Sequence, residues 1–140
     1  MTETQKKFGI DPQTIKLEMT ERILMEGVVV LDTLQRCREL GYQISIDDFG
    51  TGFSSLQYLA KMPIDFIKID SSFVQKMLAE PKTEAVVKSI IYLAQTLSIK
   101  IIGEGVETEA QMNKLIELGA DYGQGYLFSK PIPLEEIILV

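Results

Sequence analysis

Two adjacent aspartates, Asp47 and Asp48, stand at the end of an apolar run, and two glycines, Gly50 and Gly52, follow them. Neighbouring carboxylates repel each other unless a proton or a cation lies between them. Their oxygens suit the hard cations Mg²⁺, Mn²⁺ and Ca²⁺. The segment therefore either holds a metal ion or forms an acidic turn between a strand and a helix, and the glycines would let the chain bend sharply beside it.

The composition excludes several other kinds of site. The chain has no histidine and one cysteine, Cys37, so it can form neither a Ser-His-Asp triad, nor a zinc site made of histidines or thiolates, nor an intrachain disulfide. Any metal would be held by oxygen, and any general base would be Asp, Glu, Lys, Tyr or a metal-bound water. The net charge of −6 argues against a DNA- or RNA-binding protein, but it allows a phosphate substrate bound through cations.

The length of 140 residues and the apolar content of 46% suit one domain over residues 1–140. No apolar run reaches the ~18 residues that a membrane span needs. The polar N-terminus, MTETQKKFGIDPQ, lacks the basic and then apolar layout of a signal peptide. We therefore expect a soluble, cytoplasmic protein with no membrane segment.

Short apolar runs alternate with helical patterns along the chain. The expected strands are Ile15–Met19, Gln43–Asp47, Phe66–Asp70, Lys100–Gly103 and Gly123–Phe128. The expected helices are Ile23–Leu40, Ser54–Met62, Lys82–Leu97 and Thr108–Leu118, with a further helical turn at Phe73–Leu78. This alternation predicts an α/β fold with right-handed crossovers and about five parallel strands.

Polar side chains stand at or near the carboxyl end of every expected strand. In chain order they are Glu18 and Glu21, Asp47 and Asp48, Lys68 and Asp70, Glu104 and Glu107, and Gln124. Strand ends are often polar only because they meet solvent. In parallel α/β folds, however, the carboxyl edge of the sheet is where sites form, and five successive strands would bring these groups to one rim. A site at that rim is therefore the favoured interpretation.

Five segments resemble the signature blocks of the EAL domain family. They are LEMTER, DDFGTGFSSL, PIDFIKID, GEGVET and GQGYLFSKP, and they occur in the family's order and at spacings similar to the family's. The family consists of bacterial phosphodiesterases that cleave cyclic di-GMP to the linear dinucleotide pGpG. The resemblance implies a (βα)8 TIM-type barrel with one strand reversed, of which this chain would form the C-terminal part as a single truncated domain.

The same resemblance implies a two-metal mechanism with Mg²⁺ or Mn²⁺, in which the ions polarise the phosphate and activate a water. By this resemblance Glu18 is expected to bind one metal ion, Asp47 to bridge both, and Asp48 to bind the second. Glu104 is expected to bind metal or water.

Three further roles follow from the resemblance. Lys68 would orient the attacking water or help to deprotonate it, and Gln124 would hold water in the site. Glu107 would anchor the loop Asp48–Leu56, which contains the two glycines and which in the family also contributes to dimer contacts.

Other roles remain open for several of these residues. Glu18 could be a solvated edge residue, and Glu21 is expected to cap the next helix rather than bind metal. Lys68 could simply form an ion pair with Asp48 and have no catalytic role. Asp70 could stabilise its own turn.

The chain also departs from the family pattern. It contains neither the E-[A/V/I]-L motif, whose Glu is a metal ligand, nor the family's Asn ligand in an upstream NLS-like segment. We therefore expect cyclic di-GMP as the ligand but impaired hydrolysis, and we expect self-association through open sheet edges, or an attached or partner signalling domain. The alternative is a regulatory or protein-binding module, derived from an EAL domain, that does not hydrolyse the nucleotide.

Overall fold

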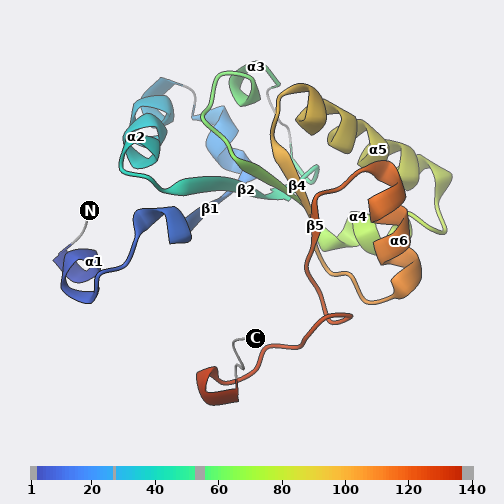
Figure 1. Ribbon diagram of the computed structural model, residues 1–140. Coiled ribbons are helices and arrows are strands. Elements are labelled where there is room, and N and C mark those ends of the chain that lie inside the picture. Colours follow the sequence, from blue (N-terminus) through green and yellow to red (C-terminus); the bar gives the residue numbers. More distant parts are fainter. Residues whose placement is uncertain (1–2, 27, 53–55, 137–140) are drawn as a thin grey trace.

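The computed structural model describes residues 3–26, 28–52 and 56–136, which form five parallel strands joined by helices (Figure 1). The strands are β1 (Lys16–Thr20), β2 (Gln43–Phe49), β3 (Phe66–Ile69), β4 (Lys100–Gly103) and β5 (Tyr122–Gly123). The helices are α1 (Glu3–Phe8), α2 (Val28–Glu39), α3 (Leu56–Leu59), α4 (Ser71–Lys76), α5 (Pro81–Thr96) and α6 (Glu109–Leu118). Short 3₁₀ turns occur at Pro12–Thr14, Glu21–Met25 and Leu134–Glu136.

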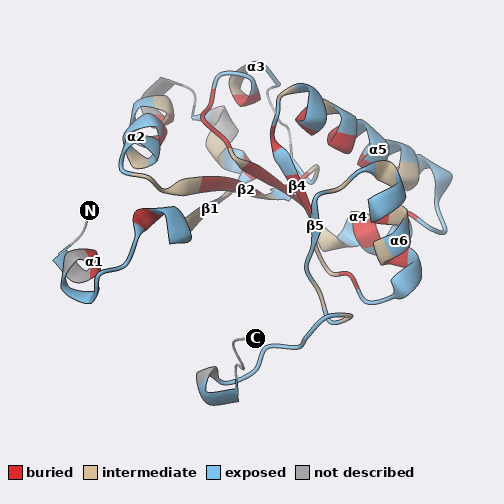
Figure 2. Cartoon of the chain, viewed as in Figure 1, coloured by how far each residue is buried: buried red, intermediate tan, exposed pale blue. Residues whose placement is uncertain are grey.

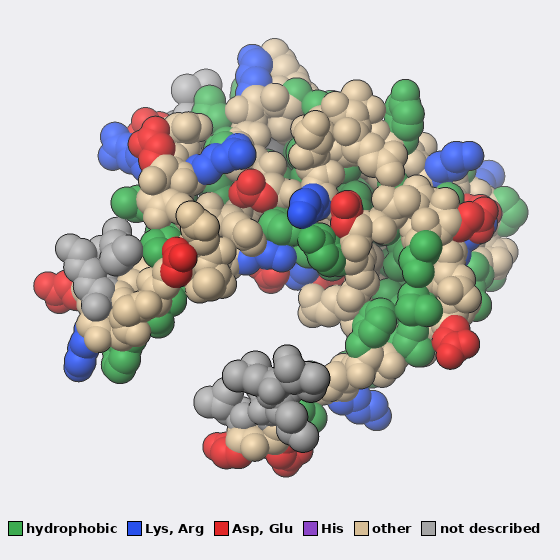
Figure 3. Space-filling view, in the orientation of Figure 1, with side chains coloured by type: hydrophobic (Ala, Val, Ile, Leu, Met, Phe, Trp, Pro, Cys, Tyr) green, Lys and Arg blue, Asp and Glu red, His purple; other side chains and the backbone are tan. Residues whose placement is uncertain are grey.

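The strands lie in the sheet in the order in which they occur in the chain, and every neighbouring pair is parallel. Helices α2, α3 and α5 lie over one face of this sheet (Figure 1), as successive crossovers of the same hand require. Among the described residues no helix covers the opposite face in the same way. The molecule is hollowed there, between the N-terminal and C-terminal segments (Figure 3).

The two faces of the sheet differ because side chains alternate along a strand. Fully buried isoleucines of the strands form the core with apolar residues of the covering helices. They are Ile44, Ile46, Ile67, Ile69 and Ile101. Figure 2 shows buried segments, in red, along the central strands of the sheet. The residues that alternate with these isoleucines along β2 and β3, such as Ser45, Phe66 and Lys68, point to the uncovered face. Phe66 lies there beside Tyr122, with a ring-centroid distance of 6.1 Å, and under the ammonium group of Lys16.

One predicted helix is divided in the structure. The sequence predicts a continuous helix over Ile23–Leu40, whereas the chain forms a 3₁₀ turn over Glu21–Met25 and then α2. Two residues separate the pieces, Glu26 and Gly27, and glycine is a poor helix former. Position 27 lies outside the described residues, as do Phe53, Ser54 and Ser55 of the predicted loop and helix.

The last strand is shorter than predicted. Instead of a strand over Gly123–Phe128, β5 ends at Gly123 and the chain then folds around Val106. The Val106 N–H donates to the carbonyl of Gln124, and the Leu127 N–H donates to the carbonyl of Val106. A Cβ at Gly125 would lie 2.2 Å from the Val106 carbonyl oxygen. This close contact between two main-chain segments, at Gly125 and at Val106, replaces the expected strand.

No helix in the described part of the chain is long and apolar enough to cross a bilayer.

The packing of the central strand can be tested with Ile67→Ala. Ile67 is fully buried on β3, so the substitution removes apolar contacts and leaves a cavity that the surrounding helices cannot fill. We expect the free energy of unfolding in urea to fall by about 3 kcal/mol. Val86→Ala, at a position that is 40% exposed on α5, is the control and should change it by less than about 0.5 kcal/mol. Equal effects of the two substitutions would contradict the central position of β3.

Candidate functional site

The ammonium group of Lys68 lies among three carboxylates on the uncovered face of the sheet. Its Nζ is 2.8 Å from Glu104 Oε1, 3.1 Å from Asp47 Oδ1 and 3.1 Å from Glu18 Oε2. The Lys68 side chain is only 5% exposed. We call these four residues the lysine–carboxylate cluster. Four different strands contribute to it, since β1, β2 and the end of β4 surround Lys68 of β3.

Asp48 lies beside this cluster because of an unusual backbone conformation. Consecutive strand residues normally point to opposite faces, so Asp47 and Asp48 would be separated in a regular strand. Asp48 instead has a φ of +54°, at a register shift between β2 and β3. Its N–H donates to Asp47 Oδ1 over 3.1 Å. The two carboxylates can therefore lie on the same side of the sheet.

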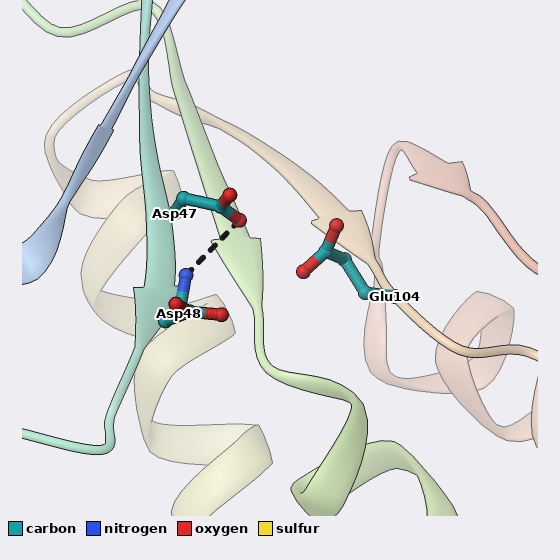
Figure 4. Close-up of side chains that lie close together, drawn as sticks. All are labelled: Asp47, Asp48 and Glu104. Carbon is teal, nitrogen blue, oxygen red and sulfur yellow. Dashed lines mark hydrogen bonds between the residues drawn. The ribbon is translucent and has the colours of Figure 1, made fainter.

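The carboxylates of Asp47, Asp48 and Glu104 face a common space at the ends of β2 and β4 (Figure 4). One oxygen from each lies within 4.8 Å of the other two. All three donors are carboxylate oxygens, which is the set that fits a hard divalent cation such as Mg²⁺, Mn²⁺ or Ca²⁺. The metal-binding roles that the sequence predicts for these three residues remain predictions. Glu18 contacts Lys68 but does not belong to this group of three.

Burial and mutual repulsion affect the ionisation of these acids. The pKa of Asp48 is raised by burial and by the neighbouring charges of Asp47 and Asp70, which outweigh the opposite effect of Lys68. The pKa of Glu104 is also raised, because burial outweighs its hydrogen bond with Lys68. Burial is the largest cause of both shifts, and the charge of Asp47 adds to each of them, an effect that a bound cation would oppose.

The pKa of Lys68 is raised as well. Burial by itself would lower it, but hydrogen bonds to Glu104, Asp47 and Glu18 outweigh the cost of burial. The side chain is therefore a cation throughout the neutral pH range. The sequence-based alternative, in which Lys68 pairs only with Asp48, does not describe its three closest partners.

A buried glutamate holds the loop that follows the acid pair. Oε2 of Glu21 accepts the N–H of Gly50 over 3.0 Å and the N–H of Gly52 over 2.9 Å. Gly50 has a φ of +101°, and a Cβ there would lie 3.0 Å from the Phe73 ring, so the turn requires glycine. Glu21 follows the N-cap position, held by Thr20, and its side chain contacts this loop.

Glu107 was expected to anchor the same loop, and the structure places it differently. Its side chain is exposed, and its N–H donates to Gln111 Oε1 at the start of α6. No hydrogen bond joins its carboxylate to the loop residues that the structure describes. The anchoring carboxylate seen here is Glu21. Sequence reasoning missed it, although an acid three residues after Glu18, at the end of β1, was a usable signal.

Two other predicted polar residues have defined surroundings. Asp70 is the N-cap of α4 and accepts hydrogen bonds from the N–H and the hydroxyl of Ser72, so it stabilises its own turn. Gln124 is exposed, and its N–H donates to the Gly103 carbonyl over 2.8 Å. This bond places Gln124 next to the end of β4, while the role expected for its side chain remains a prediction.

The sequence matches the model of the EAL domain over residues 2–131. The cyclic di-GMP phosphodiesterase RocR of Pseudomonas aeruginosa is 41% identical over 133 residues, which cover 94% of this chain and 34% of that protein. The signaling protein YkoW of Bacillus subtilis is 44% identical over 138 residues, which cover 96% of this chain and 17% of that protein. The chain thus spans about a third or less of the length of these relatives.

Solved structures of EAL proteins have the same fold. The EAL enzyme Bd1971 in its cGMP-bound form aligns with a TM-score of 0.91 and 58% identity, over 94% of this chain and 35% of that one. The PaMucR phosphodiesterase in complex with c-di-GMP aligns with a TM-score of 0.91 and 39% identity, over 96% of this chain and 55% of that one. Klebsiella pneumoniae BlrP1 with manganese and cyclic di-GMP aligns with a TM-score of 0.83 and 31% identity, over 92% of this chain and 33% of that one. The predicted fold class, an α/β partial barrel of the TIM type, is confirmed.

Asp48→Asn tests the charge balance of the site. Because the pKa of Asp48 is raised on folding, its ionised form costs stability, and this cost disappears as the pH falls through the raised pKa. The amide removes the charge and tolerates the positive φ. In chelator at pH 7 we expect a small rise in the melting temperature, because solvent screens the charge of this exposed side chain, with the gain vanishing as the pH falls to about 4. Asp32→Asn, at an exposed ion pair on α2, is the control and should give no such gain. A loss of stability in Asp48→Asn would contradict the excess of negative charge.

Glu21→Ala tests the loop anchor. It leaves the N–H groups of Gly50 and Gly52 without their acceptor, and we expect it to cost about 1–3 kcal/mol and to speed amide exchange at both glycines. Glu21→Gln is the matched variant, since its amide oxygen can still accept both bonds, and it should keep most of the protection. Unchanged exchange in Glu21→Ala would show that the loop does not depend on this carboxylate.

Proposed function

The chain belongs to the EAL domain family, and we propose that it contributes the carboxyl-edge residues of a site that hydrolyses cyclic di-GMP to the linear dinucleotide pGpG. One observation carries this proposal. Oxygens of Asp47, Asp48 and Glu104 lie within 4.8 Å of one another, and the Lys68 ammonium group contacts two of these three side chains. The similarity to the cyclic di-GMP phosphodiesterase RocR and to the PaMucR complex with c-di-GMP supports the choice of substrate.

A divalent cation would be held by Asp47, Asp48 and Glu104. Glu18, on β1, would be a further carboxylate near the site. We propose Mg²⁺ or Mn²⁺, and the similarity to BlrP1, whose structure contains manganese, supports this choice. When bound, such a cation polarises a phosphate oxygen and lowers the pKa of a coordinated water.

The chain's own residues would prepare the site for this reaction. Lys68 Nζ contacts three carboxylate oxygens, so its ammonium group acts as a hydrogen-bond donor in the protein without metal. Of the two roles that the sequence allows, this favours orienting the attacking water and stabilising negative charge over deprotonating the water. Glu104 and Asp47 accept hydrogen bonds from Lys68 and so fix the direction of its ammonium group.

We further propose that the 140-residue polypeptide, tested by itself, hydrolyses cyclic di-GMP slowly. The sequence contains neither the E-[A/V/I]-L motif nor the Asn ligand that the family resemblance implies. Another chain or domain would have to supply their oxygens, and the edges of β1 and β5, unpaired in the described part of the sheet, are where it could join. A second candidate function is nucleotide binding without hydrolysis. Binding without hydrolysis is favoured because only three acids, Asp47, Asp48 and Glu104, form a possible metal site among the described residues.

Calorimetric titration with Mn²⁺ tests the metal site. We expect binding by the wild-type chain and an affinity at least about tenfold lower for Asp47→Asn, which keeps the shape of the side chain but lowers its charge. Asp32→Asn is the control, because it removes a charge that lies on exposed α2. Equal affinity of all three proteins for Mn²⁺ would contradict the proposed ligand set.

Incubation with cyclic di-GMP and Mn²⁺, followed by chromatography for pGpG, then separates the two functions. Slow turnover that Asp47→Ala abolishes supports hydrolysis, whereas nucleotide binding without any pGpG supports the binding module. Fast turnover by the 140-residue chain would overturn the proposal that other oxygens are needed.

A further inference from the structure

Asp65 lies at the opposite end of the sheet from the site, immediately before β3. Its Oδ2 accepts the N–H of Ile44 over 2.9 Å, and its own N–H donates to the carbonyl of the same residue over 2.9 Å. Its carbonyl accepts the N–H of Lys100 over 3.0 Å. One residue therefore binds the main chains of β2 and β4 at the point where β3 begins between them.

These bonds act on the register of the sheet. The pairing that follows Asp65 places Phe66 beside Ser45 on one side and beside Lys100 on the other. In this register Lys68 lies next to the carboxylates of β2 and β4. A slip by one residue would turn its side chain from the uncovered face to the face that packs against the helices.

The register needs this support because the other end of the β2–β3 pair is irregular. The pairing shifts between Ile46 and Phe49, where Asp48 takes its positive φ. Main-chain bonds at the carboxyl end therefore constrain the two strands less than a regular ladder would. The bonds at Asp65 hold the regular end.

Asp121 repeats the arrangement at a different pair of strands. Its Oδ2 accepts the N–H of Ile101 over 2.8 Å, and its N–H donates to the carbonyl of Ile101 over 3.2 Å. Asp121 precedes β5, which contributes no member of the lysine–carboxylate cluster. It therefore makes the same kind of clamp without the same connection to the site.

We propose that Asp65 is a positioning residue for the lysine–carboxylate cluster, because its clamp fixes the register of β2, β3 and β4. It acts over about 10 Å, which is the length of three residue steps along β3 from Asp65 to Lys68. The inference deepens the proposed function, on which its metal-binding readout rests. The geometry of the strands provides a readout that does not involve metal.

Two substitutions separate the shape of Asp65 from its charge. Asp65→Asn keeps an oxygen where Oδ2 accepts the Ile44 N–H but loses the charge. Asp65→Glu keeps the charge but moves the oxygens by one methylene. Arg38→Ala isolates the other contact of Asp65, since Arg38 Nη2 lies 3.6 Å from Asp65 Oδ1. Asp121→Ala is the control for a clamp of the same type.

The first measurement is the amide NMR spectrum without metal. We expect Asp65→Glu to shift the amides of Asp47, Asp48 and Lys68, while Asp65→Asn, Arg38→Ala and Asp121→Ala leave these three near their wild-type positions. Shifts confined to the residues around position 65, with only a loss of overall stability, would overturn the proposal. Larger shifts in Asp65→Asn than in Asp65→Glu would also overturn it, because charge and not shape would then matter.

The second measurement is calorimetric titration with Mn²⁺. We expect the affinity of Asp65→Glu to fall by about tenfold and that of the other three variants to stay within about twofold of wild type. Unchanged affinity in Asp65→Glu would count against the inference. If the wild-type chain binds no Mn²⁺, the proposed function fails in that respect, and the amide shifts alone decide the role of Asp65.

Discussion

The buried ammonium group of Lys68 determines how the charged side chains on the uncovered face of the sheet are arranged. A lysine side chain that is 5% exposed is costly unless opposite charges surround its ammonium group, and Lys68 contacts three carboxylates, on β1, on β2 and directly after β4. Three carboxylates exceed one ammonium group, so the compensation leaves an excess of negative charge. The pKa of Glu104 is raised chiefly because burial outweighs its hydrogen bond with Lys68, and the neighbouring Asp47 adds to this shift. The same interaction thus holds the strands' polar ends together and leaves them able to accept a further cation.

Much of the fold could be predicted from the sequence, because parallel strands covered by helices appear as short apolar runs. The runs at Phe66–Asp70 and Lys100–Gly103 correspond closely to β3 and β4. The prediction failed at β5, where alternation suggested a strand. Packing of Gly125 on the main chain of Val106 ends that strand, and such a contact between distant backbones has no local pattern.

The site was predictable in its place but not in its detail. Parallel strands share a direction, so polar residues at their ends had to gather at one edge. The sequence did not reveal that Glu21 binds the loop, since its partners are main-chain N–H groups, which nearly every residue has. Nor did it reveal how Asp47 and Asp48 reach the same side, because a single positive φ at Asp48 decides this.

The order of the strands in the sheet has a consequence for how the chain acquires its structure. Each strand pairs with the one synthesised just before it, so the sheet can grow from β1 onward while the polypeptide is still being made. Its last carboxylate, however, comes from Glu104, 86 positions after Glu18 in the sequence. During synthesis Lys68 must therefore spend an interval with only its two earlier acidic partners. The lysine–carboxylate cluster can therefore be complete only after all of its four strands have been synthesised.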